Sequence, residues 1–154
     1  MSVQIVLGSK SDMKVAEKAI AVLRELGIKY KLSIASAHRT PELVDKLVAE
    51  ADAEVFIAIA GLSAALPGVI AARTIKPVIG VPVSGTLNLD AILSVVQMPP
   101  GVPVAGVGLD RGENAALLAA AILALKDAKI RKALSNYRQK LKDQVAQDSK
   151  EVET

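Results

Sequence analysis

The sequence predicts an α/β domain built on a doubly wound parallel sheet of five strands in the order 2-1-3-4-5. Five short apolar runs alternate with segments of helical spacing, and parallel strands need such crossover connections. Two of the runs, 55–59 and 77–83, are apolar at nearly every position, as expected of strands covered on both faces. A chain of 154 residues fits one domain that buries a sizeable core.

The first three strands are expected over 3–7, 30–34 and 54–60. A helix over 12–26 joins the first two, and Gly27 ends it as a left-handed cap would. A second helix begins at Pro41, which suits the first helical position, and Thr40 is placed to cap it.

The second half of the chain continues the alternation. A short helix is expected around 69–73, strands over 77–83 and 102–109, and helices over 89–96 and 113–125.

An extra amphipathic C-terminal helix is expected from Ala128, because apolar residues recur there at spacings of three and four. Its last residues, from about Gln147, have the polar composition of a frayed end. We therefore divide the chain into a domain over 1–127 and a helix with tail over 128–154, which packs on its own domain or on a neighbouring subunit.

Composition excludes several classes of site. The chain has no cysteine, which removes disulfides, thiolate zinc sites and cysteine nucleophiles. With one histidine, sites built on two or three histidines are excluded as well. No carboxylate cluster is evident that would hold magnesium, so we expect no metal.

The partners of the chain are expected to be small molecules. The N-terminus enters a strand directly without a signal peptide, and no apolar run reaches membrane-spanning length, so we expect a cytoplasmic protein with no membrane partner. The net charge of +3 comes from a late basic run that is typical of a solvated helix face. Because aromatic residues make up 2% of the chain, a stacking platform for nucleic acid is not expected. The basic run consists of Lys129, Arg131, Lys132, Arg138, Lys140 and Lys142.

Three loops are expected to meet at one cleft. In the order 2-1-3-4-5, the crevice opens at the carboxyl ends of strands one and three. The loop Gly8–Asp12 follows the first strand and opens a helix, so its amides and hydroxyls suit a phosphate or a ribose. The alternative is that Ser11 or Asp12 only caps the helix. The loop 61–68 has no charged side chain and allows close approach of its backbone.

The segment Ser36–Pro41 carries the single histidine, His38, next to Arg39. Histidine can give or take a proton near neutral pH without special tuning, and arginine is a fixed cation suited to a phosphate or a carboxylate. The alternative is that His38 merely fills a loop. Ser36 lies near it, but the sequence contains no nucleophile elbow, which argues against a serine hydrolase.

Several of these segments occur together in one known family. Over about residues 3–127, the chain resembles the N5-carboxyaminoimidazole ribonucleotide mutases of purine biosynthesis. Any one of the motifs is a weak signal, whereas their shared order and spacing are specific. The motifs are Gly8-Ser9-Lys10-Ser11-Asp12, Ser36-Ala37-His38-Arg39-Thr40-Pro41, Leu66-Pro67-Gly68, Pro77-Val78-Ile79-Gly80-Val81-Pro82-Val83, Gln97-Met98-Pro99 and Asn114-Ala115-Ala116.

The resemblance implies a flavodoxin-like subunit in a homo-octamer, with each active site built from more than one chain. It implies that Ser9 and Asp12 bind a ribonucleotide, that Arg39 binds its phosphate, and that His38 is the general acid/base. We expect four further residues to complete the substrate-binding surface: Gly8, Ser36, Gly61 and Ser63.

The family reaction moves a carboxylate from an exocyclic nitrogen to ring carbon 4. The resemblance implies that carbon dioxide is released within the site, that the ring carbon attacks it, and that His38 removes the proton from that carbon. No metal, biotin or ATP is needed for this step, so no cofactor is expected.

The chain departs from the bacterial mutase pattern in its third loop. Ala65 stands where those mutases carry a second histidine, and Leu62 stands where the related carboxylases have an arginine. The segment Gln97–Pro99 resembles the mutases and favours that activity. Two alternatives remain: an aminoimidazole ribonucleotide carboxylase that uses free carbon dioxide, and a nucleotide-binding module that has lost catalysis.

Overall fold

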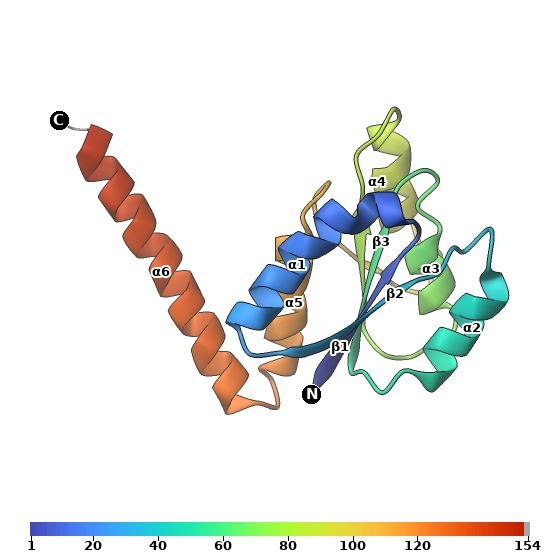
Figure 1. Cartoon of the computed structure of the whole chain (residues 1–154), viewed down its shortest axis with the longest axis horizontal. Coiled ribbons are helices and arrows are strands. Elements are labelled where there is room, and N and C mark those ends of the chain that lie inside the picture. The colour runs from blue at the N-terminus through green and yellow to red at the C-terminus, as the bar shows by residue number, and fades with distance from the viewer. Residues whose placement is uncertain (153–154) are drawn as a thin grey trace.

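Five parallel strands form one sheet in the order β2-β1-β3-β4-β5, which confirms the predicted topology. The computed structural model describes residues 1–152. Figure 1 shows the sheet between two layers of helices, with the last helix reaching away from the body. The strands are β1 (Ser2–Leu7), β2 (Lys29–Ile34), β3 (Val55–Ala60), β4 (Val78–Pro82) and β5 (Ala105–Gly106).

The helices follow the predicted alternation with small shifts at their ends. Gly27 has a φ of +68° at the end of the first helix, which confirms the expected left-handed cap. A single 3₁₀ turn, η1 (Lys10–Asp12), precedes that helix. The helices are α1 (Met13–Glu25), α2 (Pro41–Glu50), α3 (Leu66–Ala71), α4 (Asn88–Val96), α5 (Gly112–Leu123) and α6 (Ala128–Val152).

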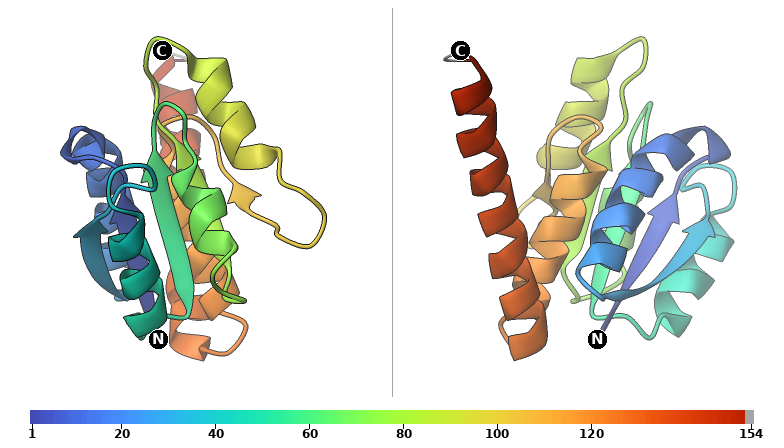
Figure 2. Two further views of the ribbon diagram at one scale, coloured as in Figure 1. Left: turned by 90° about the vertical axis from the view of Figure 1, so that its right-hand side faces the viewer. Right: turned by 60° about the vertical axis from the view of Figure 1, so that its left-hand side comes forward.

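Alternate residues of the central strands enter two separate cores, because successive side chains of a strand point to opposite faces. Ile5 and Ile57 belong to the core under α1 and α5. Val6 and Phe56 belong to the core under α2, α3 and α4. Figure 2 shows these helices on the two faces of the sheet.

The third helix begins at Leu66, three residues before the expected start at 69, and two further elements differ more in extent. The fifth strand was expected over 102–109, but only Ala105 and Gly106 pair with β4. Pro103 has no N–H to donate, and a Cβ at Gly106 would lie 2.7 Å from Val96 of α4, so this edge is shaped by close approach to α4. Residues 147–152 were expected to fray but are helical.

The first half of the final helix is anchored to the domain. Ile130 is buried against the core under α1 and α5, and Lys140 forms an ion pair with Glu25 at 3.0 Å. Leu141 and Val145 are 50% and 67% exposed. In Figure 1 the second half of α6 extends past the rest of the domain.

Two of the basic residues predicted to form a solvated face hold α6 in place. Arg131 donates to the carbonyl oxygen of Ala124 at 2.9 and 3.1 Å, which satisfies the end of α5. Lys140 is the partner of Glu25. Of the helices in residues 1–152, none combines the length and the apolar composition of a membrane span.

Candidate active site

The three loops predicted to share a cleft leave the sheet side by side. The ladder continues past the strand ends, where the N–H of Gly8 donates to Ile59 at 3.0 Å and the N–H of Ala35 donates to Leu7 at 2.9 Å. The loops after β1, β2 and β3 are thereby held at one edge of the sheet. Between them lies a cavity of about 350 Å³.

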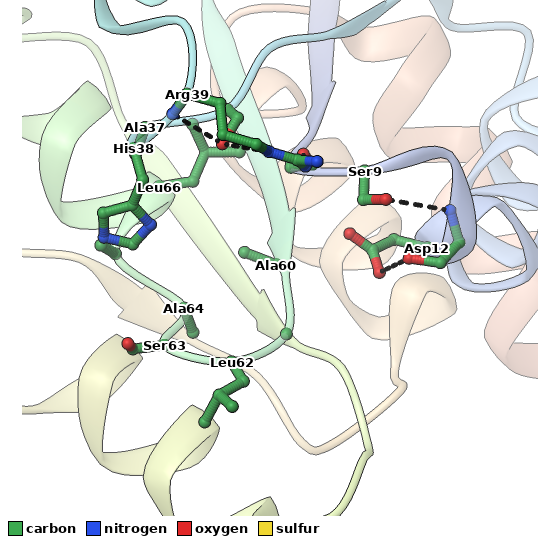
Figure 3. Close-up of a pocket in the computed structure, with 15 residues that line it drawn as sticks. Ser9, Asp12, Ala37, His38, Arg39, Ala60, Leu62, Ser63, Ala64 and Leu66 are labelled. Carbon is green, nitrogen blue, oxygen red and sulfur yellow. Dashed lines mark hydrogen bonds between the residues drawn. The ribbon is translucent and has the colours of Figure 1, made fainter.

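Every residue predicted from the sequence to belong to the site lines this cavity. Figure 3 shows the side chains from the three loops around it. The predicted residues are Gly8, Ser9, Asp12, Ser36, His38, Arg39, Gly61 and Ser63.

His38 presents its imidazole to the cavity. The side chain is exposed, and in Figure 3 the ring points toward the loop that carries Ser63 and Ala64. Within residues 1–152, the ring has no hydrogen-bond or ion-pair partner. Both ring nitrogens are therefore available to a ligand, as a proton-transfer group requires.

Arg39, on the loop after β2, is held by its own loop and by the loop after β1. Its Nε and its backbone N–H donate to the hydroxyl of Ser36 at 3.3 and 3.2 Å, and one terminal nitrogen donates to the carbonyl oxygen of Gly8 at 3.0 Å. A guanidinium has five N–H donors, of which these side-chain bonds use two, so three remain. A fixed cation with free donors is suited to a phosphate.

Asp12 is a buried carboxyl in the wall of the cavity, with 7% of its surface exposed. Burial raises the pKa of Asp12 above its ordinary value, and hydrogen bonds from Ser11 and Ser9 together with the charge of Arg39 offset part of that effect. The hydroxyl of Ser11 donates to its Oδ1 at 3.1 Å. The carboxyl remains able to accept hydrogen bonds from a ligand.

The residues at the two helix starts do not use their side chains as caps. Asp12 occupies the N-cap position of α1 but makes no side-chain capping bond; the hydroxyl of Ser9 accepts a hydrogen bond from the N–H of Ser11 at 3.4 Å, which caps the 3₁₀ turn. Thr40 occupies the N-cap position of α2, but its side chain makes no capping bond. Its hydroxyl bonds back to Ser36 instead.

Apolar groups from the loop after β3 complete the wall. Leu62, which is 70% exposed, Ala64 and Ala65 line the cavity, and so does Ala37 beside His38. Apart from the departures noted at Leu62 and Ala65, these side chains were not predicted to line the site, because small apolar residues carry no chemical signature. The signal for those after β3 was the run of uncharged, mostly small residues between Gly61 and Gly68.

The charged groups of the site do not form a metal centre. Among residues 1–152, no three histidine, cysteine, aspartate or glutamate side chains lie together as metal ligands. The site residues instead combine one imidazole, one guanidinium and one carboxyl with several hydroxyls. This combination suits an anionic substrate on which a proton is moved.

Comparison with known proteins identifies relatives over nearly the whole chain. The N5-carboxyaminoimidazole ribonucleotide mutase of Methanocaldococcus jannaschii is 61% identical over 148 residues, which is 95% of this chain and 94% of that protein. A relative from Methanobrevibacter smithii is 53% identical across 97% of this chain, which spans 45% of that longer protein.

A solved structure has the same fold. The PurE protein of Treponema denticola superposes with a TM-score of 0.89 and 33% identity, covering 99% of this chain and 98% of that one. The family model described as AIR carboxylase matches residues 2–144. The chain therefore belongs to the AIR carboxylase family.

Proposed function

We propose that this protein is an N5-carboxyaminoimidazole ribonucleotide mutase of purine biosynthesis, which converts that substrate into 4-carboxy-5-aminoimidazole ribonucleotide. The observation that carries the proposal is the cavity in which the unpartnered imidazole of His38 and the fixed guanidinium of Arg39 lie together. The mutase from M. jannaschii, with 61% identity, supports the same activity.

The ribonucleotide is anchored by the loops after β1 and β2. Arg39 binds the phosphate through its free N–H donors, with Gly8 and Ser9 next to it in the cavity wall. Asp12 would repel a phosphate, so it accepts hydrogen bonds from the sugar hydroxyls. Ser36 keeps its hydroxyl proton for the ligand, because its oxygen acts as the acceptor for Arg39.

The loop after β3 covers the base. Gly61 and Ser63 offer backbone and hydroxyl contacts, while Leu62 and Ala64 provide an apolar surface. An apolar surface suits carbon dioxide, which is uncharged and held weakly by water. Holding it next to the ring raises its effective concentration and limits its escape.

One imidazole is enough to balance the protons of the reaction. In the first step His38, as the acid, protonates the exocyclic nitrogen while the bond from that nitrogen to the carboxylate carbon breaks and carbon dioxide leaves. In the second step, ring carbon 4 attacks carbon dioxide, and neutral His38 removes the proton from carbon 4. One proton is given and one is taken, so Ala65 in place of a second histidine does not block the cycle.

A second candidate is carboxylation of aminoimidazole ribonucleotide by free carbon dioxide. The observation that favours it is Ala65, since the bacterial mutase pattern has a second histidine at this position. In that reaction His38 acts only as the base at carbon 4. A catalytically inactive binding module is the third candidate, which the free imidazole of His38 argues against.

Assembly into an octamer is part of the proposal. Closed assemblies of dihedral symmetry need more than one kind of interface, and exposed apolar side chains occur on two separate helices: Leu89 and Leu93 on α4, and Leu141 and Val145 on α6. A neighbouring subunit would also cover the exposed Leu62 and close the cavity. We place the enzyme in the cytoplasm, in keeping with a chain that has no cysteine.

A pair of assays tests the activity. Purified protein should interconvert N5-carboxyaminoimidazole ribonucleotide and its carbon-carboxylated isomer without ATP. If the protein consumes aminoimidazole ribonucleotide with carbon dioxide but does not consume the N5-carboxylated compound, the protein is the carboxylase and the mutase assignment is wrong. If the protein consumes neither substrate but still binds the nucleotide, the inactive binding module is the correct assignment.

A further inference from the structure

The hydroxyl of Thr40 closes the loop that carries the two charged groups of the site. It accepts a hydrogen bond from the N–H of Ser36 at 2.9 Å and lies 3.3 Å from the carbonyl oxygen of Ser36, to which it donates. The N–H of Thr40 donates to the same carbonyl oxygen at 3.0 Å. Three contacts therefore join the two ends of a five-residue loop.

This loop sets the direction of Arg39 through Ser36. The backbone of Ser36 is held by Thr40, and the Ser36 hydroxyl accepts hydrogen bonds from the backbone N–H and the Nε of Arg39. With Nε fixed, the terminal nitrogen reaches the carbonyl oxygen of Gly8 at 3.0 Å. Arg39 lines the cavity, and the donors that these bonds do not use remain available there.

Thr40 itself does not line the cavity, and its carbonyl oxygen begins α2 by accepting from Leu43 and Val44. A threonine at this position would ordinarily use its hydroxyl to cap the helix. Here α2 has no side-chain cap, and the hydroxyl is committed to Ser36. The Thr40 hydroxyl therefore stabilises the loop from Ser36 to Thr40 and not the first turn of α2.

We propose that Thr40 is a positioning residue for substrate binding, which acts through Ser36 to orient the guanidinium of Arg39. The inference rests on the proposed function, in which Arg39 binds the phosphate of the ribonucleotide. It adds a residue that touches no substrate yet sets the affinity for it.

The experiment compares Thr40→Val, which keeps the shape and removes the hydroxyl, with Thr40→Ser, which keeps the hydroxyl. The assay uses whichever of the two ribonucleotides the enzyme accepts. Thr40→Val should raise KM about threefold to tenfold, the net worth of a hydrogen bond, and Thr40→Ser should restore it. Thr74→Val is the matched control, because the Thr74 hydroxyl accepts from the N–H of Lys76 in a loop outside the cavity.

A double-mutant cycle with Arg39→Ala separates positioning from a general structural effect. If Thr40 acts through Arg39, Thr40→Val should raise KM in the wild-type background and leave it unchanged in the Arg39→Ala background. Equal increases in both backgrounds would overturn the inference, as would a wild-type KM in Thr40→Val.

Failure of the inference can be told apart from failure of the proposed function. A raised KM in Arg39→Ala with a wild-type KM in Thr40→Val would overturn the inference alone. An unchanged KM in Arg39→Ala would overturn the phosphate role of Arg39 and the inference with it. Should Thr40→Val fail to fold, Thr40→Ala in the same cycle replaces it, because it also removes the hydroxyl that bonds to the backbone of Ser36.

Discussion

Arg39 donates a hydrogen bond to the carbonyl oxygen of Gly8 at 3.0 Å, and this bond joins the loop after β2 to the loop after β1. The two strands are neighbours in the sheet, with Leu7 paired to Ile34 at their ends. The bond therefore extends the connection between β1 and β2 into the site itself. A phosphate bound at Arg39 lies where the two loops meet.

Replacing Arg39 should weaken ribonucleotide binding. We expect Arg39→Ala to raise KM about tenfold to a hundredfold, the range for hydrogen bonds to charged groups, with a smaller effect on kcat because the imidazole is untouched. Steady-state kinetics measure this. The matched control is Arg73→Ala, which removes an arginine paired with Asp45 outside the cavity and should leave KM unchanged. An equal increase in KM in both variants would point to a general effect of charge and would contradict a specific role for Arg39.

Replacing His38 should strongly slow turnover and spare binding. We expect His38→Asn to lower kcat by about 10² to 10⁴, the usual worth of a positioned acid/base. Titration calorimetry should show nucleotide affinity close to wild type, because Arg39 and Asp12 hold the substrate without the imidazole. Turnover at the wild-type rate in this variant would contradict the acid/base role and the proton cycle built on it.

The buried carboxyl of Asp12 should make stability depend on pH. Its pKa in the folded state is raised above the ordinary value of 3.8, chiefly by burial. The group therefore favours folding fully below pH 3.8, and this contribution is lost as the pH rises through the folded pKa. The asparagine in Asp12→Asn does not ionise, so this variant does not lose stability as the pH rises.

We expect the free energy of unfolding of Asp12→Asn to exceed that of the wild type at pH 7, and the difference to shrink as the pH falls toward 4. Urea denaturation at several pH values measures it. Ribonucleotide binding should weaken in the same variant, since stability and function often conflict at a binding site. A difference that grows toward low pH would mean that the carboxyl is stabilised in its ionised form.

The topology and the meeting of the three loops were predictable because each follows from chain order, whereas the individual site residues were implied by the family resemblance. Once the strands take the order 2-1-3-4-5, the loops after β1, β2 and β3 must meet at the switch point. The eight predicted residues fall on those loops and all line the cavity. The burial of Asp12 was not predictable, because it depends on how the loops pack.

Some hydrogen bonds were not predictable because one side chain has two possible partners, and the sequence does not show which of them it binds. The Thr40 hydroxyl could bond to the first turn of α2 or to Ser36. In the structure it bonds to Ser36 and makes no bond to α2. The helical end of α6 was also not predicted. Gln144 donates to Asp148 at 2.8 Å, and such pairs four residues apart support a helix of polar composition.

Close packing of α1 on α5 should make Gly112 intolerant of a side chain. A Cβ at this position would overlap the carbonyl oxygen of Val15 in α1. Gly112→Ala should therefore lower the free energy of unfolding by about 1–3 kcal/mol, the usual cost of overpacking, although alanine is the better helix former. Gly85→Ala is the control, because no atom lies within 4 Å of the added Cβ. Equal stability of the two variants would contradict the close approach of the helices.

The exposed apolar residues on the second half of α6 should form an interface between subunits. Leu141 and Val145 lie one turn apart, and full burial of such a side chain is worth about 1.5–3 kcal/mol. We expect the double variant Leu141→Lys with Val145→Lys to give a smaller particle than the wild type in light scattering.

The control for this experiment adds the same two charges on a different face of α6. Ser135→Lys with Gln139→Lys places them well away from the Leu141 side of the helix, given 3.6 residues per turn, and both positions are exposed. The control should keep the wild-type particle mass. If the Leu141 and Val145 variant also keeps that mass, this stripe is not part of the interface, and the apolar residues on α4 would have to account for assembly.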